Sequence, residues 1–251
     1  MIERVWKISL ADLWRRTVAS LEGSVPSRSL ARVSVLITML TNLNSNRLCA
    51  WLEFGAVFLT GLLFLGFVHV EAKGLFIALA SISWMIYIVW RIRRNSSLLE
   101  RWGFHTKNLL SAFVWPTGVF VIGIVLMAWY GRAHDRILWK NHIVVLLLLY
   151  PAWGILQQFL VQALGVANLM TLFPQLGRMV ALPVGVLLFS LVHYPDGWLL
   201  MLATGVMACF FIPCYLRHRN LWPLGLYHGW LGTFFYLWVL GKDPWVEVLG
   251  R

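Results

Sequence analysis

The chain has 251 residues, of which 60% are hydrophobic and only 12% are charged. Soluble domains carry about 25% charged residues, so this composition excludes an ordinary soluble globular domain and predicts a multi-pass membrane protein in the lipid bilayer. The formal net charge of +11 also occurs in nucleic-acid-binding proteins. We attribute it instead to the basic residues that gather in cytoplasmic loops, and we expect no nucleic-acid partner.

Apolar and basic residues alternate at the start of the chain, over residues 4–16. This pattern predicts either an amphipathic helix at the membrane interface or a plain cytoplasmic tail, and both alternatives stay open. Charged side chains interrupt any early apolar run, so no cleavable signal peptide is expected. We therefore assign residues 1–47 to an N-terminal cytoplasmic or interfacial segment and residues 48–251 to one membrane domain.

Seven apolar segments follow, which predicts an all-α polytopic bundle of about seven transmembrane helices. The predicted spans are residues 48–70, 75–91, 109–130, 142–164, 179–194, 197–216 and 221–241. Most approach the roughly 20 residues that a helix needs to cross a bilayer, but the second and fifth are short. With the N-terminus inside, fifteen of the 21 Lys and Arg residues fall on the inner side. This bias favours a cytoplasmic N-terminus in a bacterial-type inner or plasma membrane.

Three glutamines lie in the second half of the fourth predicted span: Gln157, Gln158 and Gln162. Each primary amide has two N–H donors and one carbonyl acceptor, which lipid cannot satisfy. Gln158 and Gln162 are four residues apart, so their shared helix face should point into the protein. There the glutamines act either as hydrogen-bonding contacts between helices or as part of a functional site. Glu53, near the start of the first span, is expected to reach the membrane interface.

Two later histidines are the candidates for what this face meets. His193 closes the segment Phe189-Ser-Leu-Val-His193, and His228 lies in the last span, shortly after Leu221-Trp222-Pro223. An ionisable residue inside a membrane span indicates a functional site by default, although a lone histidine there is more often a hydrogen-bonded packing residue. Two histidines on neighbouring helices, following a glutamine face, favour a shared pocket.

Together these residues resemble the CAAX-protease and bacteriocin-processing (CPBP, or Abi) family of intramembrane endopeptidases over residues 142–241. The family pattern is EExxxR, then FxxxH, then HxxxN or HxxxD, on successive membrane helices. Here FxxxH is intact from Phe189 to His193, and the third motif keeps its histidine at His228. The resemblance implies that a glutamate and the histidines activate a water molecule and that the asparagine helps to hold the oxyanion.

The departures from this pattern concern its charged and amide groups. Gln157, Gln158 and Gln162 stand where the family has its two glutamates and its arginine, and Gly232 stands where Asn or Asp is expected. A carboxylate accepts a proton, whereas a primary amide does not at any useful pH. Because losing a buried acid also removes the reason for a buried cation, we interpret these changes as coordinated.

The resemblance implies two alternative functions. The first is an intramembrane endopeptidase with a divergent water-activating site, which cleaves a membrane-associated peptide or protein terminus. Its predicted catalytic residues are Gln158, His193 and His228. The predicted supporting residues of the substrate pocket are Gln157, Gln162, Phe189 and Gly232. The second function is that of a catalytically inactive relative, which binds such a substrate or a partner protease as an adaptor.

We expect no cofactor and no metal, because two histidines and amides without a carboxylate or thiolate form a poor ligand set. Asp196 follows His193 by three residues and is flanked by Pro195 and Gly197. This setting is typical of a loop residue, although a role as base or orienting group stays open.

The predicted depths of the site residues conflict with one another. Gln158 and His228 are expected toward the inner leaflet, but His193 falls near the outer end of a helix that rises about 1.5 Å per residue. A shared pocket therefore requires that residues 165–178 dip back into the membrane, or that one span lies at another depth. The three prolines that offer places for such a bend are Pro151, Pro174 and Pro183.

Overall fold

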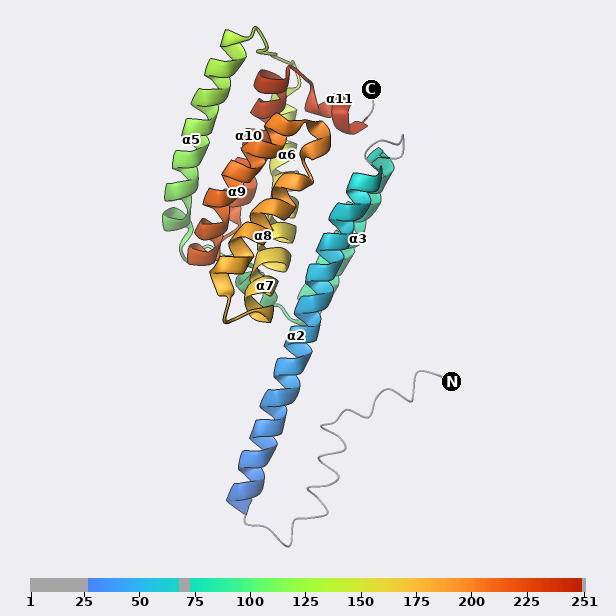
Figure 1. The fold of residues 1–251 in the computed structure, drawn as a ribbon, viewed down its shortest axis with the longest axis vertical. Helices are drawn as coiled ribbons and strands as arrows, with labels where there is room; N and C mark the ends of the chain where they lie inside the picture. Colours follow the sequence, from blue (N-terminus) through green and yellow to red (C-terminus); the bar gives the residue numbers. More distant parts are fainter. Residues whose placement is uncertain (1–26, 68–72, 250–251) are drawn as a thin grey trace. The chain divides into compact units, whose positions relative to one another are not determined.

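The structure of the protein, a computed structural model, describes residues 27–67 and 73–249, and no strand occurs in these ranges. The predicted all-α fold is thereby confirmed (Figure 1). The described residues fall into two units that divide between Leu52 and Glu53. The N-terminal interfacial segment lies largely outside the described residues, and its predicted end at residue 47 stays a prediction.

The elements follow one another in a simple order. They are α2 (Ser27–Phe67), α3 (Lys73–Arg94), α4 (Leu98–Trp102), α5 (Leu109–Ala133), α6 (Ile143–Gln158), η1 (Phe159–Val166), α7 (Ala167–Leu172), α8 (Gly177–Leu191), η2 (Tyr194–Asp196), α9 (Trp198–His218), α10 (Trp222–Phe234), η3 (Phe235–Leu240) and α11 (Pro244–Leu249). The segments η1 and η3 continue α6 and α10 as π-helices, and η2 is a single 3-10 turn.

Five of the described helices are long and apolar enough to cross a membrane. They are Asn46–Phe67, Lys73–Arg94, Leu109–Ala133, Ile143–Leu172 and Trp198–His218. The predicted count of seven spans is not confirmed. The predicted fifth span forms α8, which has only 15 residues, and the predicted seventh span forms α10 together with η3.

The helix α10 lies in the interior of the bundle, against α5 and α6 (Figure 1). Its buried residues are Pro223, Leu224, Gly225, Tyr227, His228, Gly229 and Thr233. A helix surrounded by protein can carry polar and small residues that lipid would not tolerate, because neighbouring helices satisfy them. Hydropathy therefore marks α10 less clearly than the helices around it.

The fourth predicted span is longer than expected, and this removes the conflict in depth. Its helix does not end at residue 164 but continues through η1 and α7 to Leu172, over 30 residues. The next helix, α8, is about 22 Å long at 1.5 Å per residue, and it returns along the same bundle. The ring centroids of His193 and His228 consequently lie 6.2 Å apart.

The apolar core has two clusters. The larger one includes Phe159, Phe211 and Tyr215 from η1 and α9, and the smaller one includes Leu146 and Leu237 from α6 and η3. Large apolar side chains are also exposed along the outer faces of α3 and α5. Such exposure is what helices that face lipid require.

Candidate active site

A hydrogen bond connects helices α6 and α10 next to the proline of α6. Pro151 has no N–H, so the carbonyl of Leu147, four residues earlier, lacks its usual helical donor. The indole N–H of Trp230 in α10 donates to this carbonyl at 2.9 Å. Because a bilayer offers no water to satisfy the carbonyl, this bond fixes α10 against α6 at that level.

The same two helices approach until their backbones touch. A Cβ atom added at Gly229 would lie 2.6 Å from the backbone N and Cα of Pro151, and one added at Gly225 would lie 2.6 Å from Cα of Ile155. Gly225 and Gly229 form a G-x-x-x-G pattern, which is common where membrane helices cross closely. His228 directly precedes Gly229, so this crossing sets its position against α6.

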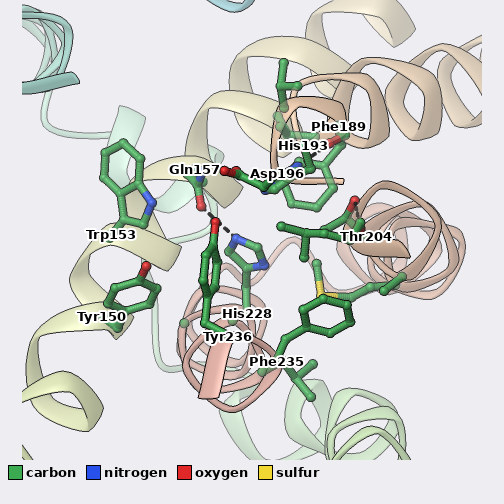
Figure 2. A pocket seen from close by; sticks show the side chains of 18 of the residues that line it. Tyr150, Trp153, Gln157, Phe189, His193, Asp196, Thr204, His228, Phe235 and Tyr236 are labelled. Carbon is green, nitrogen blue, oxygen red and sulfur yellow. Dashed lines mark hydrogen bonds between the residues drawn. The ribbon is translucent and has the colours of Figure 1, made fainter. Parts of the chain in front are cut away.

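His228 contacts Gln157 across the crossing. Its Nε2–H donates to Oε1 of Gln157 at 2.7 Å (Figure 2). Since an amide oxygen only accepts, the contact places the proton on Nε2 and leaves Nδ1 of His228 as an acceptor. Gln157 therefore orients the imidazole as a carboxylate would, but it cannot take the proton.

His193 lies just beyond α8, and its ring is held by the FxxxH motif itself. Its Nδ1–H donates to the backbone carbonyl of Phe189 at 2.7 Å, which leaves Nε2 as the acceptor. The ring of Phe189, itself buried, stands edge-on to both imidazoles, with centroids 5.0 Å from His193 and 5.2 Å from His228. Phe189 thus forms an apolar wall that both imidazoles share.

Gln158 and Gln162 do not line the cavity beside the histidines. Both are 1% exposed, and Nε2 of Gln162 donates to Oε1 of Gln158 at 3.0 Å. Oε1 of Gln162 finds no donor among the described residues. Successive helical residues point in different directions, so Gln157 and Gln158 cannot share a face. The structure brings Gln157 to the histidines, and the catalytic role of Gln158 stays a prediction.

Gly232 lies one turn after His228, on the wall of the same cavity. A Cβ atom added at Gly232 would lie 3.6 Å from the ring of Tyr150, which is an ordinary van der Waals distance. The aromatic ring of Tyr150 therefore occupies the space beside the position where the CPBP pattern has Asn or Asp. Its hydroxyl is an additional hydrogen-bonding group on this wall.

The two histidines, Gln157, Tyr150 and Gly232 line one cavity of about 1090 Å³. Its wall is mostly apolar and comes mainly from helices α2, α3, α5, α6, α8, α9, α10 and α11. Its polar lining includes Gln157, His193, Asp196, His228 and Tyr236 (Figure 2). Small-molecule sites typically enclose about 300–1,000 Å³. A cavity slightly larger than this range has room for several residues of an extended peptide.

Asp196, whose role as base or orienting group was left open, lines this site together with Tyr150 and Tyr236, which were not predicted. Asp196 ends the turn η2, and its carboxylate faces the same cavity as His193 and Tyr236 (Figure 2). Spacing offered a signal for the tyrosines. Tyr150 precedes Gln157 by seven residues, which is about two helical turns and therefore the same face.

The arrangement presents two unprotonated ring nitrogens, Nε2 of His193 and Nδ1 of His228, on neighbouring imidazoles. Such a pair can accept both hydrogens of one water molecule and leave its oxygen lone pairs free to attack a carbonyl carbon. In the part of the chain that the structure describes, no group of three or more His, Cys, Asp or Glu side chains could hold a metal ion.

One comparison with known proteins bears on this site. Residues 139–234 match the family described as Type II CAAX prenyl endopeptidase Rce1-like. The matched segment contains α6, α8, α9 and α10, and with them Gln157, His193 and His228. No curated protein and no solved structure is significantly similar to the chain.

Proposed function

On the premise that this chain belongs to the CPBP family of intramembrane proteases, through its Rce1-like domain at residues 139–234, we propose that it is an intramembrane endopeptidase. Its substrate is a membrane-associated peptide or protein terminus. The protein is an integral multi-pass membrane protein. The distribution of Lys and Arg supports a cytoplasmic N-terminus in a bacterial-type inner or plasma membrane.

The observation that carries this proposal is the pair of facing imidazoles, with ring centroids 6.2 Å apart on the wall of a large apolar cavity. A water molecule held by Nε2 of His193 and Nδ1 of His228 is oriented for attack. As its oxygen bonds to the scissile carbonyl carbon, one ring nitrogen takes a proton, which later passes to the leaving amine. Positioned general bases of this kind contribute about 10²–10⁴-fold to rate.

Gln157 supports this reaction by orientation. Its hydrogen bond to Nε2–H of His228 keeps the ring in the tautomer whose other nitrogen faces the water. The hydroxyl of Tyr150, on the cavity wall, is the donor we assign to the oxyanion that develops on the scissile carbonyl. Fixed donors stabilise such charge strongly in a site that excludes water.

Cleavage of a panel of fluorogenic membrane peptides by the purified protein, reconstituted in lipid vesicles, tests the proposal. We expect activity in the unaltered protein and its loss in His193→Ala and in His228→Ala. His134→Ala is the matched control, because His134 is exposed and follows α5. Loss of activity in the control as well would trace the effect to the general removal of an imidazole and would overturn the assignment.

One observation favours the adaptor role instead: Gln157 occupies the contact with His228, and an amide cannot accept a proton. In that case the same cavity binds a membrane substrate or a partner protease without cutting. The variant Gln157→Glu separates the two functions. A silent parent protein with an active Gln157→Glu variant would identify an intact pocket disabled at one position, and therefore an adaptor.

A further inference from the structure

We infer that Asp196 is the anionic group of this site and stabilises the imidazolium that forms on His193 during peptide-bond hydrolysis. Asp196 is a positioning residue in this role, since it acts on the reaction through His193. The inference rests on the proposed function, because it needs a proton to be transferred to His193. It explains how a site with glutamine in place of glutamate retains a counter-charge.

The need for an anion follows from the surroundings of the two histidines. When His193 takes a proton from the attacking water, a positive charge appears in a mostly apolar cavity. An uncompensated buried charge is strongly unfavourable. Gln157 cannot compensate it, because it is neutral. Without an anion nearby, neither ring would hold the proton long enough to pass it to the leaving amine.

Two carboxylates line the cavity in the described part of the chain, Asp196 and Glu247. Glu247 lies on α11 and pairs with Lys242 at 3.2 Å. Asp196 lies in the turn that directly follows His193, three residues away. Figure 2 shows its carboxylate pointing into the same space as Gln157 and Tyr236. Position therefore selects Asp196.

The turn η2 holds Asp196 in a defined place relative to His193. The backbone N–H of Asp196 donates to the carbonyl of His193 at 3.2 Å, and Pro195 restricts the backbone between them. Gly197 follows with φ 115°, a conformation that glycine adopts without strain and that starts α9. The turn is thus short and constrained, as the support of a charged group near a reacting ring should be.

Lys73, at the start of α3, pairs with this carboxylate. Its Nζ lies 3.4 Å from Oδ1 of Asp196, and the two side chains are 23% and 16% exposed. The pair also suggests a simpler role for Asp196, in which it only connects η2 to α3. The test has to separate these two roles.

In this reaction His193 carries one proton from the water to the leaving nitrogen. One O–H bond of the water breaks as its oxygen bonds to the scissile carbonyl carbon, and the proton moves to Nε2 of His193. The C–N bond then breaks, and the leaving nitrogen takes that proton from His193. The products are a carboxylic acid and an amine, and Asp196 neither gains nor loses a proton.

The experiment measures kcat and KM for the reconstituted protein with a peptide that the unaltered protein cleaves. Asp196→Asn keeps the shape of the side chain and removes its charge, and we expect kcat to fall about 100-fold with KM nearly unchanged, because only the charged transition state is affected. Asp196→Glu should keep at least a tenth of the activity. In the double variant Gln157→Glu/Asp196→Asn, the new carboxylate beside His228 should restore kcat at least tenfold over Asp196→Asn.

Two controls remove the simpler explanations. Lys73→Met breaks the ion pair but keeps the carboxylate, so it should cost much less activity than Asp196→Asn. Equal losses from the two variants would mean that Asp196 acts only as the partner of Lys73, and would overturn the inference. Glu100→Gln neutralises an exposed carboxylate outside the cavity and should leave kcat unchanged.

The outcomes for the inference and for the proposed function differ. An active parent protein whose Asp196→Asn variant keeps its kcat would overturn the role of Asp196 and leave the endopeptidase intact. A parent protein that cleaves no peptide of the panel would overturn both. If Gln157→Glu is then active, the adaptor role takes the place of the endopeptidase.

Discussion

The cluster around Glu53 and the cluster around His228 are both polar groups buried in an apolar bundle, but they differ in how their hydrogen-bonding groups are used. Glu53 was expected to reach the membrane interface, yet it is 7% exposed. Oε1 of Glu53 accepts from Tyr87 at 2.5 Å and pairs with Arg91 at 3.1 Å, while Oε2 accepts from Asn168 at 2.8 Å. Both carboxylate oxygens are therefore engaged by protein donors.

In the His228 cluster, protein groups engage only some of the hydrogen-bonding atoms. His193 and His228 each use one ring nitrogen on the protein, toward Phe189 and Gln157, and each keeps the other nitrogen as an acceptor on a cavity wall. A saturated buried cluster holds helices together, whereas a cluster with unused acceptors beside a cavity is available for chemistry. The comparison shows that unpaired acceptors beside a cavity, rather than polarity alone, distinguish a candidate site from a structural contact.

The largest effect should come from a substitution that forces apart the close crossing of α6 and α10, which sets the position of His228. Gly229→Ala places a methyl group 2.6 Å from the backbone of Pro151, which cannot rotate away. Overpacking typically costs about 1–3 kcal/mol, and we expect the free energy of unfolding to fall by at least this much. Cleavage should also be lost, because moving α10 separates His228 from Gln157. Thermal unfolding in detergent and peptide cleavage measure both effects.

The matched control for this crossing is Gly118→Ala on α5, where an added Cβ meets nothing within 4 Å. Alanine is the better helix former by about 1 kcal/mol, so this variant should be neutral or slightly more stable. A Gly229→Ala protein that is as stable as Gly118→Ala would contradict the backbone contact between α6 and α10.

The next largest effect should fall on activity alone. His228→Ala removes one of the two acceptor nitrogens, and we expect kcat to fall about 1,000-fold, within the range for a positioned general base. The free energy of unfolding should change by no more than about 2 kcal/mol, because the substitution removes one hydrogen bond, to Gln157. If stability and activity fall together, His228 holds helices together as Glu53 does, and the two clusters do not differ in role.

The Glu53 cluster should show the reverse pattern. Glu53→Gln removes the charge that faces Arg91, whose side chain is 25% exposed. Breaking a fully buried pair costs about 3–5 kcal/mol, and this exposure reduces our expectation to about 2 kcal/mol. Cleavage per folded molecule should not change. Melting curves beside those of Glu100→Gln measure the effect, and a stable Glu53→Gln protein without activity would assign Glu53 to the site.

The smallest effect concerns the glutamine pair next to the site. Gln158→Leu leaves the buried amide of Gln162 without its acceptor, and we expect a cost of about 1 kcal/mol, the lower end of the range for an unsatisfied polar group. Replacing both glutamines by leucine removes the two partners together and should cost less than either single change. A double-mutant cycle of unfolding free energies measures this coupling. Additive losses would show that the two amides are independent.

The amino-acid sequence by itself determined the class of the protein and the identity of its motif residues. Apolar composition requires helices in a bilayer, because they satisfy their own backbone hydrogen bonds. The order QQxxxQ, FxxxH and a later histidine resembles the pattern of one protease family, and it selected His193 and His228. Buried amides need hydrogen-bond partners, so the sequence predicted that Gln158 and Gln162 face the protein interior. There they bond to each other.

Only the tertiary structure decided which glutamine meets His228, how His193 reaches the same depth, and that Asp196 lies beside them. These features depend on the rotation and length of whole helices. The rotation is set by the backbone contact of Gly225 and Gly229 with α6, and the depth by the continuation of one helix to Leu172. Hydropathy and spacing are local properties of the chain, whereas these contacts join segments about 70 residues apart. For that reason the sequence identified the histidines, and the fold selected their partners.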